Sequence, residues 1–275
     1  MQIALIQQIA TADKKANLDK GLASLEKAAR AGAEMVCFAE LAFEPFYPQK
    51  EVVGDPATLA EPVPGPITAA FQKVAAELGV VVVLNLFERE GDRTFDSSPV
   101  IDANGRLLGR TRMVHITDYA CFHEKGYYVP GDTGAPVYET RVGRIGVAIC
   151  YDRHYPEYMR ALALAGAQVV VVPQAGAVGE WPEGLYEAEM RVAAFQNGYF
   201  TALCNRVGEE ECLSFAGESF VCDPAGRVIA RAPEMEESIL YADLDLAEVD
   251  RSHARELFLK DRRPELYADW LTARV

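Results

Sequence analysis

The segment RIGVAICYDRHYPEYMRALALAGAQVVVVP, residues 144–173, determines the class of fold. Its first apolar run ends at Cys150, a polar turn follows, and Pro156 then opens a segment with apolar residues three and four positions apart. A second apolar run, residues 168–173, completes the pattern. This order of strand, helix and strand is typical of a βαβ unit with two parallel strands.

The same alternation extends over most of the chain. Several of the apolar runs are apolar on both faces, which is typical of central strands covered on two sides. Further strands are predicted at residues 3–7, 35–39, 80–87 and 200–204, and further helices at 17–31, 67–78 and 184–197. We therefore expect an α/β protein with a single domain over residues 1–275.

Two stretches predict hairpins instead of βαβ units. In SSPVIDANGRLLGRTR, residues 97–112, alternating strands flank Asn104-Gly105, which is a strong turn signal. A second meander is predicted at VCDPAGRVIARAP, residues 221–233. The Pro-rich segment EPVPGP, residues 61–66, is interpreted as a surface loop and not as a domain boundary.

Composition narrows the range of partners. The formal net charge of -14 disfavours nucleic acids and anionic membranes, because both are usually bound through clustered Lys and Arg. No apolar stretch approaches the ~20 residues needed to cross a bilayer, and the first apolar run has no basic segment before it. We expect a cytoplasmic protein that acts on a small molecule.

Cysteines and histidines are scattered. The six cysteines include no CxxC pair, which favours reduced thiols over disulfides or a zinc site. The four histidines form no HExxH motif, and GxSxG, P-loop and GxGxxG motifs are absent from the sequence. We therefore expect no metal and no cofactor.

Three β-like runs end close to a residue that is a candidate for the site: Glu40, Met113 and Cys150. The carboxyl ends of strands line the ligand crevice in open α/β folds. The turn and helix after Cys150 can direct backbone N–H groups at a thiolate. From spacing alone Cys150 is either a nucleophile or a buried cysteine at the end of a strand, and both interpretations stay open.

Several segments in a fixed order resemble one family. CFAELAF, FHEKGYYVPGD, GRIGVAICYDRHYPE, ALALAGAQVVVVP and DRRPELY resemble the nitrilase superfamily of carbon–nitrogen hydrolases over essentially the whole chain. GRTRMVHITDYACFHEKGYY is most similar to the branch of N-carbamoyl-amino-acid amidohydrolases and β-ureidopropionases. The resemblance implies a four-layer αββα sandwich, a homodimer or higher homo-oligomer, and hydrolysis of N-carbamoyl amino acids or small amides through a cysteine thioester.

The resemblance also implies roles for particular residues. Cys150 matches the nucleophile, Glu40 the general base, and Glu124 a second glutamate that orients the substrate. A carboxylate beside the thiol can accept its proton during attack and then activate the water that hydrolyses the thioester. Met113 departs from the pattern, because it occupies the position of the family's lysine.

Met113 weakens the expectation of activity. A thioether carries no charge and donates no hydrogen bond, so it cannot stabilise an oxyanion, and one such donor contributes about 2.7–4 kcal/mol. Glutamates that lose a balancing cation should also bind protons more tightly. The chain is therefore either an amidase or carbamoylase, with an ω-amidase or aliphatic amidase as a variant, or a silent, lysine-replaced homologue that binds a small ligand or a protein partner.

Three other residues that can carry a positive charge are candidates to replace the lysine. Arg112 should face away from Met113, since neighbours on a strand point to opposite sides. The order of preference is Lys125, then His115, then Arg153. For Arg153 we expect instead a substrate carboxylate, which a guanidinium binds through two parallel hydrogen bonds.

Two aromatic residues complete the predicted substrate site. The backbone N–H of Tyr151 is a candidate donor to the oxyanion. Trp181 follows a strand end, where loops line the crevice, so it either shapes the substrate pocket or packs at a subunit contact.

Overall fold

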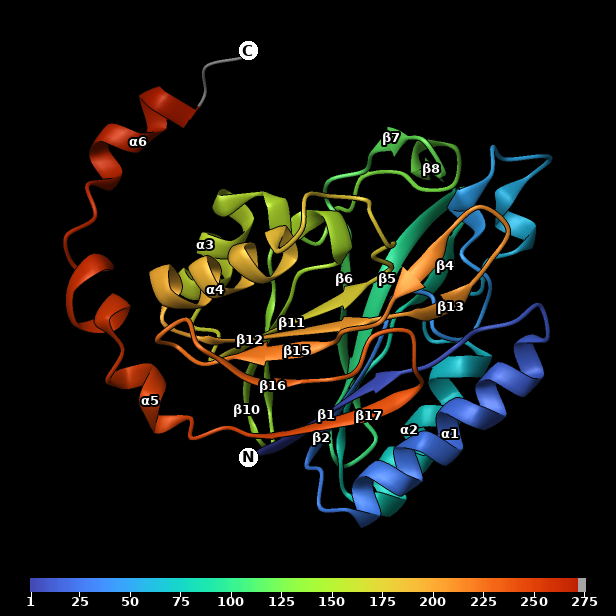
Figure 1. Cartoon of the computed structure of the whole chain (residues 1–275), viewed down its shortest axis with the longest axis horizontal. Helices are drawn as coiled ribbons and strands as arrows, with labels where there is room; N and C mark the ends of the chain where they lie inside the picture. The colour runs from blue at the N-terminus through green and yellow to red at the C-terminus, as the bar shows by residue number, and fades with distance from the viewer. Residues whose placement is uncertain (272–275) are drawn as a thin grey trace.

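The computed structural model describes residues 1–271, in which two β-sheets pack face to face and carry helices on their outer sides (Figure 1). Strands β1 and β2 of one sheet contact β11 and β12 of the other. Helices α1 and α2 lie against the first sheet, and α3 and α4 against the second. The layers therefore follow the order helix, sheet, sheet, helix, and the predicted αββα sandwich is confirmed.

The first sheet has seven strands within the described residues. The path runs β17-β1-β2-β3-β5-β4, and β6 pairs with β5. Along this path the strands are β17 (Ser238–Asp243), β1 (Gln2–Gln7), β2 (Met35–Phe38), β3 (Val81–Val83), β5 (Arg93–Ile101) and β4 (Leu86–Glu90), and β6 (Leu107–Arg112) lies on the edge of β5 opposite β3 and β4. The β1, β2 and β3 pairings are parallel, as the βαβ pattern predicts.

The second sheet has six strands in the same part of the chain. They follow the order β16 (Val228–Arg231), β15 (Phe220–Cys222), β12 (Phe200–Asn205), β11 (Val169–Gln174), β10 (Gly143–Val147) and β9 (Val137–Thr140). The pairs β10–β11 and β11–β12 are parallel. Two small hairpins join β7 (Asp118–Tyr119) to β8 (Phe122–His123) and β13 (Val207–Glu209) to β14 (Ser214–Ala216).

The helices begin close to the predicted positions. The α-helices are α1 (Lys14–Arg30), α2 (Pro66–Leu78), α3 (Pro156–Leu164), α4 (Leu185–Asn197), α5 (Ala247–Asp250) and α6 (Pro264–Leu271). Short 3₁₀ turns are η1 (Tyr47–Gln49), η2 (Pro56–Thr58), η3 (Glu124–Gly126) and η4 (Cys150–His154), and Ala254–Phe258 form a π-helical turn. Pro156 occupies the first position of α3, where its missing N–H costs no helical hydrogen bond.

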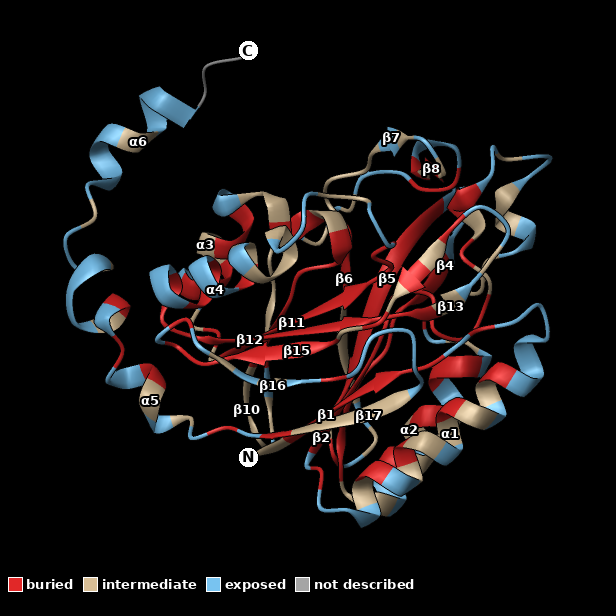
Figure 2. Ribbon diagram, viewed as in Figure 1, coloured by how far each residue is buried: buried red, intermediate tan, exposed pale blue. Residues whose placement is uncertain are grey.

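The strands alternate between three apolar cores. In β1, Leu5 belongs to the core between the sheets, whereas Ala4 and Ile6 belong to a second core under α1 and α2. In β11, Val171 belongs to the central core and Val170 to a third core under α3 and α4. This period of two explains why the runs are apolar at every position, and Figure 2 shows the central strands buried.

The prediction of one strand over residues 80–87 is wrong. The run is interrupted at Leu84 and Asn85, and its two parts, β3 and β4, pair antiparallel with the same edge of β5 in one continuous register. Asn85 is buried at the break: its side chain accepts a hydrogen bond from the Leu41 N–H (2.8 Å) and donates to Asp96 (2.5 Å). A buried amide side chain with such hydrogen bonds competes with the regular backbone hydrogen bonds between neighbouring strands.

Both predicted hairpins are confirmed, since β5 pairs antiparallel with β6 and β15 with β16. The first turn needs a glycine, because Gly105 has φ +79° and a Cβ there would lie 2.5 Å from the carbonyl oxygen of Gln72.

After β17 the chain leaves the sandwich through α5 and the π-helical turn. Helix α6 projects from the body and has no buried residue (Figures 1 and 2). Within residues 1–271, no helix combines the length and the apolar character needed to cross a membrane.

Candidate active site

Cys150 lies in a strained turn that follows β10. It opens η4 with φ +43°, a left-handed conformation that residues other than glycine seldom adopt. Its carbonyl oxygen accepts a hydrogen bond from Nη1 of Arg153 (2.9 Å), and its side chain is 5% exposed. A strained backbone that surrounding contacts hold in place is a frequent feature of functional turns.

Glu40, the predicted general base, follows β2. The residue is fully buried, and neither carboxyl oxygen has a hydrogen-bond partner among the described residues that meets strict geometry. Burial raises the pKa of Glu40 well above its usual range, and the charges of Asp96 and Glu124 raise it further. The Cys150 thiol lies close enough to act on the same carboxyl in the opposite direction. The structure thus brings the thiol and the carboxyl together.

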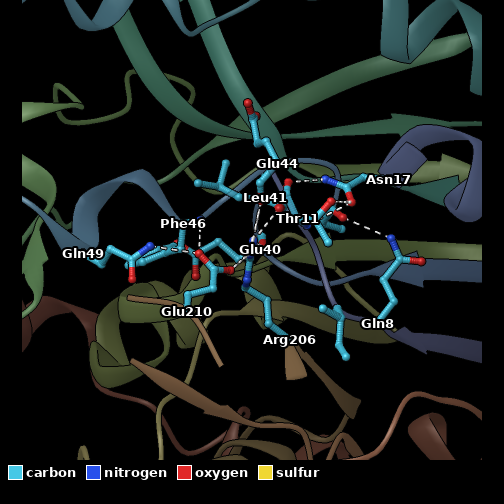
Figure 3. Close-up of polar contacts among 12 residues, drawn as sticks. Gln8, Thr11, Asn17, Glu40, Leu41, Glu44, Phe46, Gln49, Arg206 and Glu210 are labelled. Carbon is cyan, nitrogen blue, oxygen red and sulfur yellow. Dashed lines mark hydrogen bonds and ion pairs between the residues drawn. The ribbon is translucent and has the colours of Figure 1, made fainter. Parts of the chain in front are cut away.

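Arg206 fixes the backbone of the segment that begins at Glu40 (Figure 3). Its guanidinium is buried and donates to the carbonyl oxygens of Glu40 (3.0 Å), Leu41 and Glu44 (3.1 Å). It also pairs with the carboxylate of Glu210. Arg206 is a site residue that the sequence does not predict, because nothing in the local pattern after β12 indicates a contact with residues more than 160 positions away.

Glu124 enters the same region from η3. It is 1% exposed, and its Oε2 accepts a hydrogen bond from the N–H of Thr117 (3.1 Å). Burial raises the pKa of Glu124 well above its usual range, the Thr117 N–H opposes that change, and the Asp96 and Glu180 carboxylates add to it. The structure therefore places Glu124 in the buried region near Cys150, although the residues beside it in the sequence are charged.

Asp96 is a third buried carboxyl that the sequence analysis missed. It lies on β5, is 1% exposed, accepts from Asn85 through Oδ1 and has no partner at Oδ2. Burial raises its pKa to about 7. The available signal was a carboxyl in a strand that is buried along most of its length, just before the predicted hairpin.

Met113 lies beside these carboxyls and supplies no charge. It is 1% exposed and belongs to the central apolar core together with Cys150 and Tyr128. Its N–H donates to the backbone carbonyl of Asp96 (2.9 Å). Glu40 and Glu124 therefore lie near the thiol, and Asp96 lies near both glutamates, without a lysine, in agreement with the raised proton affinity that the sequence predicts.

The candidate replacement cations occupy other positions. The Lys125 side chain is exposed, while its backbone N–H donates to Asp118. Arg112 points away as predicted, pairing with Glu88 and Asp132, and its guanidinium lies 3.8 Å from the centre of the Phe95 ring.

His115 and Arg153 are linked to the Cys150 turn in different ways. The Nδ1 of His115 lies 2.7 Å from the buried carboxylate of Asp152, and its ring stacks on Tyr155. Asp152 also accepts the N–H groups of residues 114 and 115, so it ties the segment after Met113 to η4. Arg153 binds Glu189 (3.1 Å) and Gln174 (2.8 Å), and its charge lowers the pKa of the Cys150 thiol, which burial and Glu40 raise.

Trp181 and Tyr151 lie at the edge of the site. Trp181 lines a cavity of about 530 Å³ together with Gln174 and Tyr186, and its ring is 5.1 Å from that of His154. Tyr151 is half-buried, with its ring 5.0 Å from the same histidine. Cys150 is not among the residues that line this cavity, but Arg153 binds both its carbonyl oxygen and the cavity residue Gln174. Within residues 1–271, no three His, Cys, Asp or Glu side chains are grouped to hold a metal ion.

Replacing Asp96 by asparagine should stabilise the protein at alkaline pH. The folded-state pKa of Asp96 is about 7, against an ordinary value of 3.8. The contribution of this carboxyl to the free energy of unfolding is therefore fully present below pH 4 and is lost as the pH rises through 7. We expect the free energy of unfolding of Asp96→Asn at pH 8 to exceed that of the wild type by roughly 2–4 kcal/mol. Urea denaturation at pH 4.5 and pH 8 measures the difference.

The control for this prediction is Asp92→Asn, which changes an exposed aspartate four residues away. It should alter the free energy of unfolding by less than about 0.5 kcal/mol. An Asp96→Asn effect of equal size at both pH values would contradict the assignment of a buried, proton-binding carboxyl.

Comparison with known proteins identifies the family of the chain. The family model described as carbon-nitrogen hydrolase matches residues 2–254. An N-carbamoylputrescine amidase from Solanum lycopersicum is 35% identical, covering 98% of this chain and 94% of its own length. A carbon-nitrogen hydrolase from Helicobacter pylori G27 has a TM-score of 0.90 at 28% identity, covering 100% of this chain and 99% of that one.

A variant amidase from Nesterenkonia sp. AN1 carries the acetamide moiety of fluoroacetamide on its active-site cysteine. Its TM-score is 0.82 at 28% identity, and the match covers 98% of this chain and 96% of that one. The chain therefore belongs to the carbon–nitrogen hydrolase family, as its resemblance to the nitrilase superfamily implied.

Proposed function

We propose that the protein hydrolyses a C–N bond of N-carbamoyl compounds or small amides, with Cys150 as nucleophile and Glu40 as general base. The observation that carries this proposal is the burial of the Cys150 thiol within hydrogen-bond reach of the buried Glu40 carboxyl, which also lies beside Asp96. As sulfur bonds to the carbonyl carbon, its proton passes to Glu40 and then to the leaving nitrogen, which departs as ammonia or an amine. Water then attacks the thioester and gives its proton to Glu40, the C–S bond breaks to release the acid, and the sulfur takes the proton back from Glu40.

Glu124 and the backbone of η4 complete the mechanism. Glu124 accepts hydrogen bonds from the substrate's nitrogen and so fixes the plane of the reacting group. The N–H of Tyr151 donates to the developing oxyanion. Met113 supplies no second donor, so the site stabilises a neutral amide's transition state less than a lysine would.

Three buried donors support a substrate with an acceptor at its distal end. Nη2 of Arg153, Nε2 of Gln174 and Nε1 of Trp181 have no hydrogen-bond partner among the described residues. Gln174 and Trp181 line the cavity beside the site, and Arg153 contacts Gln174. A carboxylate there would satisfy donors that are otherwise costly to bury, which favours N-carbamoyl amino acids over simple amides.

We also propose that the protein is a cytoplasmic homodimer or higher homo-oligomer with a small-molecule substrate as its partner. Apolar side chains lie exposed on the outer face of α3 and α4 and along the C-terminal segment, an arrangement that supports a subunit contact. These residues are Leu164, Val192, Phe195, Leu257, Phe258, Leu266, Trp270 and Leu271. The net charge of -14 disfavours nucleic acids and anionic membranes as partners.

A substrate panel tests the function. The protein is incubated with N-carbamoyl-β-alanine, N-carbamoylputrescine and propionamide, and ammonia release is measured by a coupled enzymatic assay. We expect turnover of at least one member, with N-carbamoyl-β-alanine preferred because its carboxylate reaches the unpaired donors. Absence of ammonia from all three, together with specific binding of one of them, would favour the silent homologue that Met113 suggests.

A further inference from the structure

The inference starts from the charge around the reacting thiol, and it rests on the proposed function. Three carboxyl residues from different elements are each no more than 1% exposed. They are Glu40 in the segment after β2, Asp96 on β5 and Glu124 in η3. Buried carboxylates repel one another strongly, so without a cation among them they bind protons, as the raised pKa values of all three reflect. The lysine position holds Met113, which is neutral.

The buried cations of the region bind other groups. Arg112 pairs with Glu88, Glu90 and Asp132, and Arg206 binds backbone carbonyl oxygens and Glu210. Arg153 has one free nitrogen, but its other contacts hold it beside Glu189, Gln174 and the backbone of Cys150. Arg153 forms no ion pair or hydrogen bond with any of the three buried carboxyls within the described residues. The described residues thus leave the carboxyls without a protein cation.

Acceptor atoms at the site also lack donors. Both carboxyl oxygens of Glu40 and Oδ2 of Asp96 have no partner among the described residues that meets strict hydrogen-bond geometry. The hydroxyl of Tyr128 is also buried and unpartnered near all three carboxyls, and it can donate only one hydrogen bond to them. Unpaired buried polar atoms are costly, so this arrangement points to a bound group that brings several N–H donors.

We propose that the substrate itself supplies the missing cation: the site binds a planar amidinium or guanidinium group at its reacting carbon and hydrolyses one of its C–N bonds. An amidinium has the plane and size of an amide, but it replaces the carbonyl oxygen with a second nitrogen and carries a positive charge. Its N–H groups match paired carboxylates in the manner of a guanidinium fork. Because the reacting carbon must lie beside the Cys150 sulfur, the charge lies among the carboxyls.

The chemistry with such a group needs no oxyanion donor in its first step. As the sulfur bonds to the central carbon, the thiol proton passes to Glu40, and the C–N π electrons move to nitrogen and neutralise its charge. Glu40 returns the proton to one amino group, the C–N bond breaks, and ammonia leaves a cationic thioimidate on Cys150. Water adds to that carbon and gives its proton to Glu40, after which the C–S bond breaks and the sulfur regains a proton.

The balance of this reaction is one water consumed and one ammonium ion released. An amidinium gives an amide, and a guanidinium gives a ureido compound, which is itself an N-carbamoyl amine. The charge that a lysine would bring to stabilise an oxyanion is present in the substrate from the outset. A neutral methionine at position 113 then favours substrate binding, since a lysine at this position would repel the positive charge of the substrate.

Two isosteric pairs test the proposal: 3-guanidinopropionate with N-carbamoyl-β-alanine, and acetamidine with acetamide. Each pair differs in the charge and the donors of the reacting group, and the second pair has no tail that could bind Arg153. Isothermal titration calorimetry at pH 8 measures binding, and NMR measures the ureido or amide product together with ammonium. We expect each cation to bind about tenfold or more tightly than its neutral partner and to be hydrolysed faster.

Variants at residue 113 separate charge from shape. Met113→Lys should reverse the preference in both pairs, whereas Met113→Leu, which keeps an apolar side chain of similar volume, should retain it. Propylammonium serves as a cation without a plane and should bind more weakly than acetamidine. Equal affinity for the members of each pair, or a preference that Met113→Lys leaves intact, would overturn the proposal.

The outcomes also distinguish this proposal from the proposed function. Hydrolysis of N-carbamoyl-β-alanine without binding of either cation would overturn the cationic substrate and leave the carbamoylase intact. Tight cation binding without hydrolysis of any compound would support the assignment of charge and count against the catalytic role of Cys150.

Discussion

Replacing Cys150 by alanine should abolish ammonia release from every compound that the protein hydrolyses, a loss of roughly four orders of magnitude or more. The effect is this large because Glu40 and Glu124 act on a bond that only the sulfur makes, and without it water would have to attack the substrate unaided. Steady-state ammonia assays with the wild type and Cys150→Ala, at equal concentrations of folded protein, measure the ratio.

Cys222→Ala is the matched control for that substitution. Cys222 is buried in the third core, under α3 and α4, on the far side of the second sheet from the carboxyls. Its replacement should leave turnover within about twofold of the wild type. Activity of Cys150→Ala that equals the activity of Cys222→Ala would mean that the chemistry takes place without the thiol.

Met113→Lys should raise the turnover of neutral amides and N-carbamoyl compounds by about 10²–10³-fold. The new ammonium would lie among buried carboxyls, where it can donate to the oxyanion that forms from a carbonyl. It should also lower the raised pKa of Glu40, because an adjacent positive charge favours the ionised carboxylate. More of the general base is then available at neutral pH, so the alkaline rise of kcat/KM should move to lower pH.

The control for the lysine is Met113→Leu, which adds neither charge nor donor. It should leave the turnover of neutral amides close to that of the wild type and the pH profile unmoved. Thermal denaturation of both variants shows whether either is misfolded. A folded Met113→Lys variant without any gain would indicate that the site does not need a donor at this position.

The layered fold was predictable because it depends on short-range patterns. Strands that are apolar at every position, such as β2 and β11, must be covered on both faces, and the helical segments between them supply one cover each. The exception was the run at residues 80–87, where composition alone indicated a single strand. The buried side chain of Asn85 divides it, and its partners lie 44 and 11 residues away.

The site was predictable only where residues follow strands within recognisable segments. Glu40 and Cys150 follow predicted strands, Glu124 was predicted from the family resemblance alone, and the structure places all three in one buried region. Asp96 and Arg206 were missed, since the first is defined by its burial on β5 and the second by contacts with a distant loop.

The replacement cation illustrates the same limit. The preference for Lys125 depended on the reach of a side chain in a loop, yet η3 buries Glu124 while it leaves the next residue exposed. The orientation of each side chain within this turn decides which one is buried, and the residue types alone do not predict that orientation.

The most direct test of the central claim is to observe the covalent intermediate. The protein is mixed with propionamide, quenched in acid within the first turnover and digested, and each cysteine-containing peptide is analysed by mass spectrometry. A propionyl group on Cys150, absent from the other five cysteines and removed when turnover continues, is the predicted result. Ammonia released in the first turnover while Cys150 stays unmodified would contradict the account.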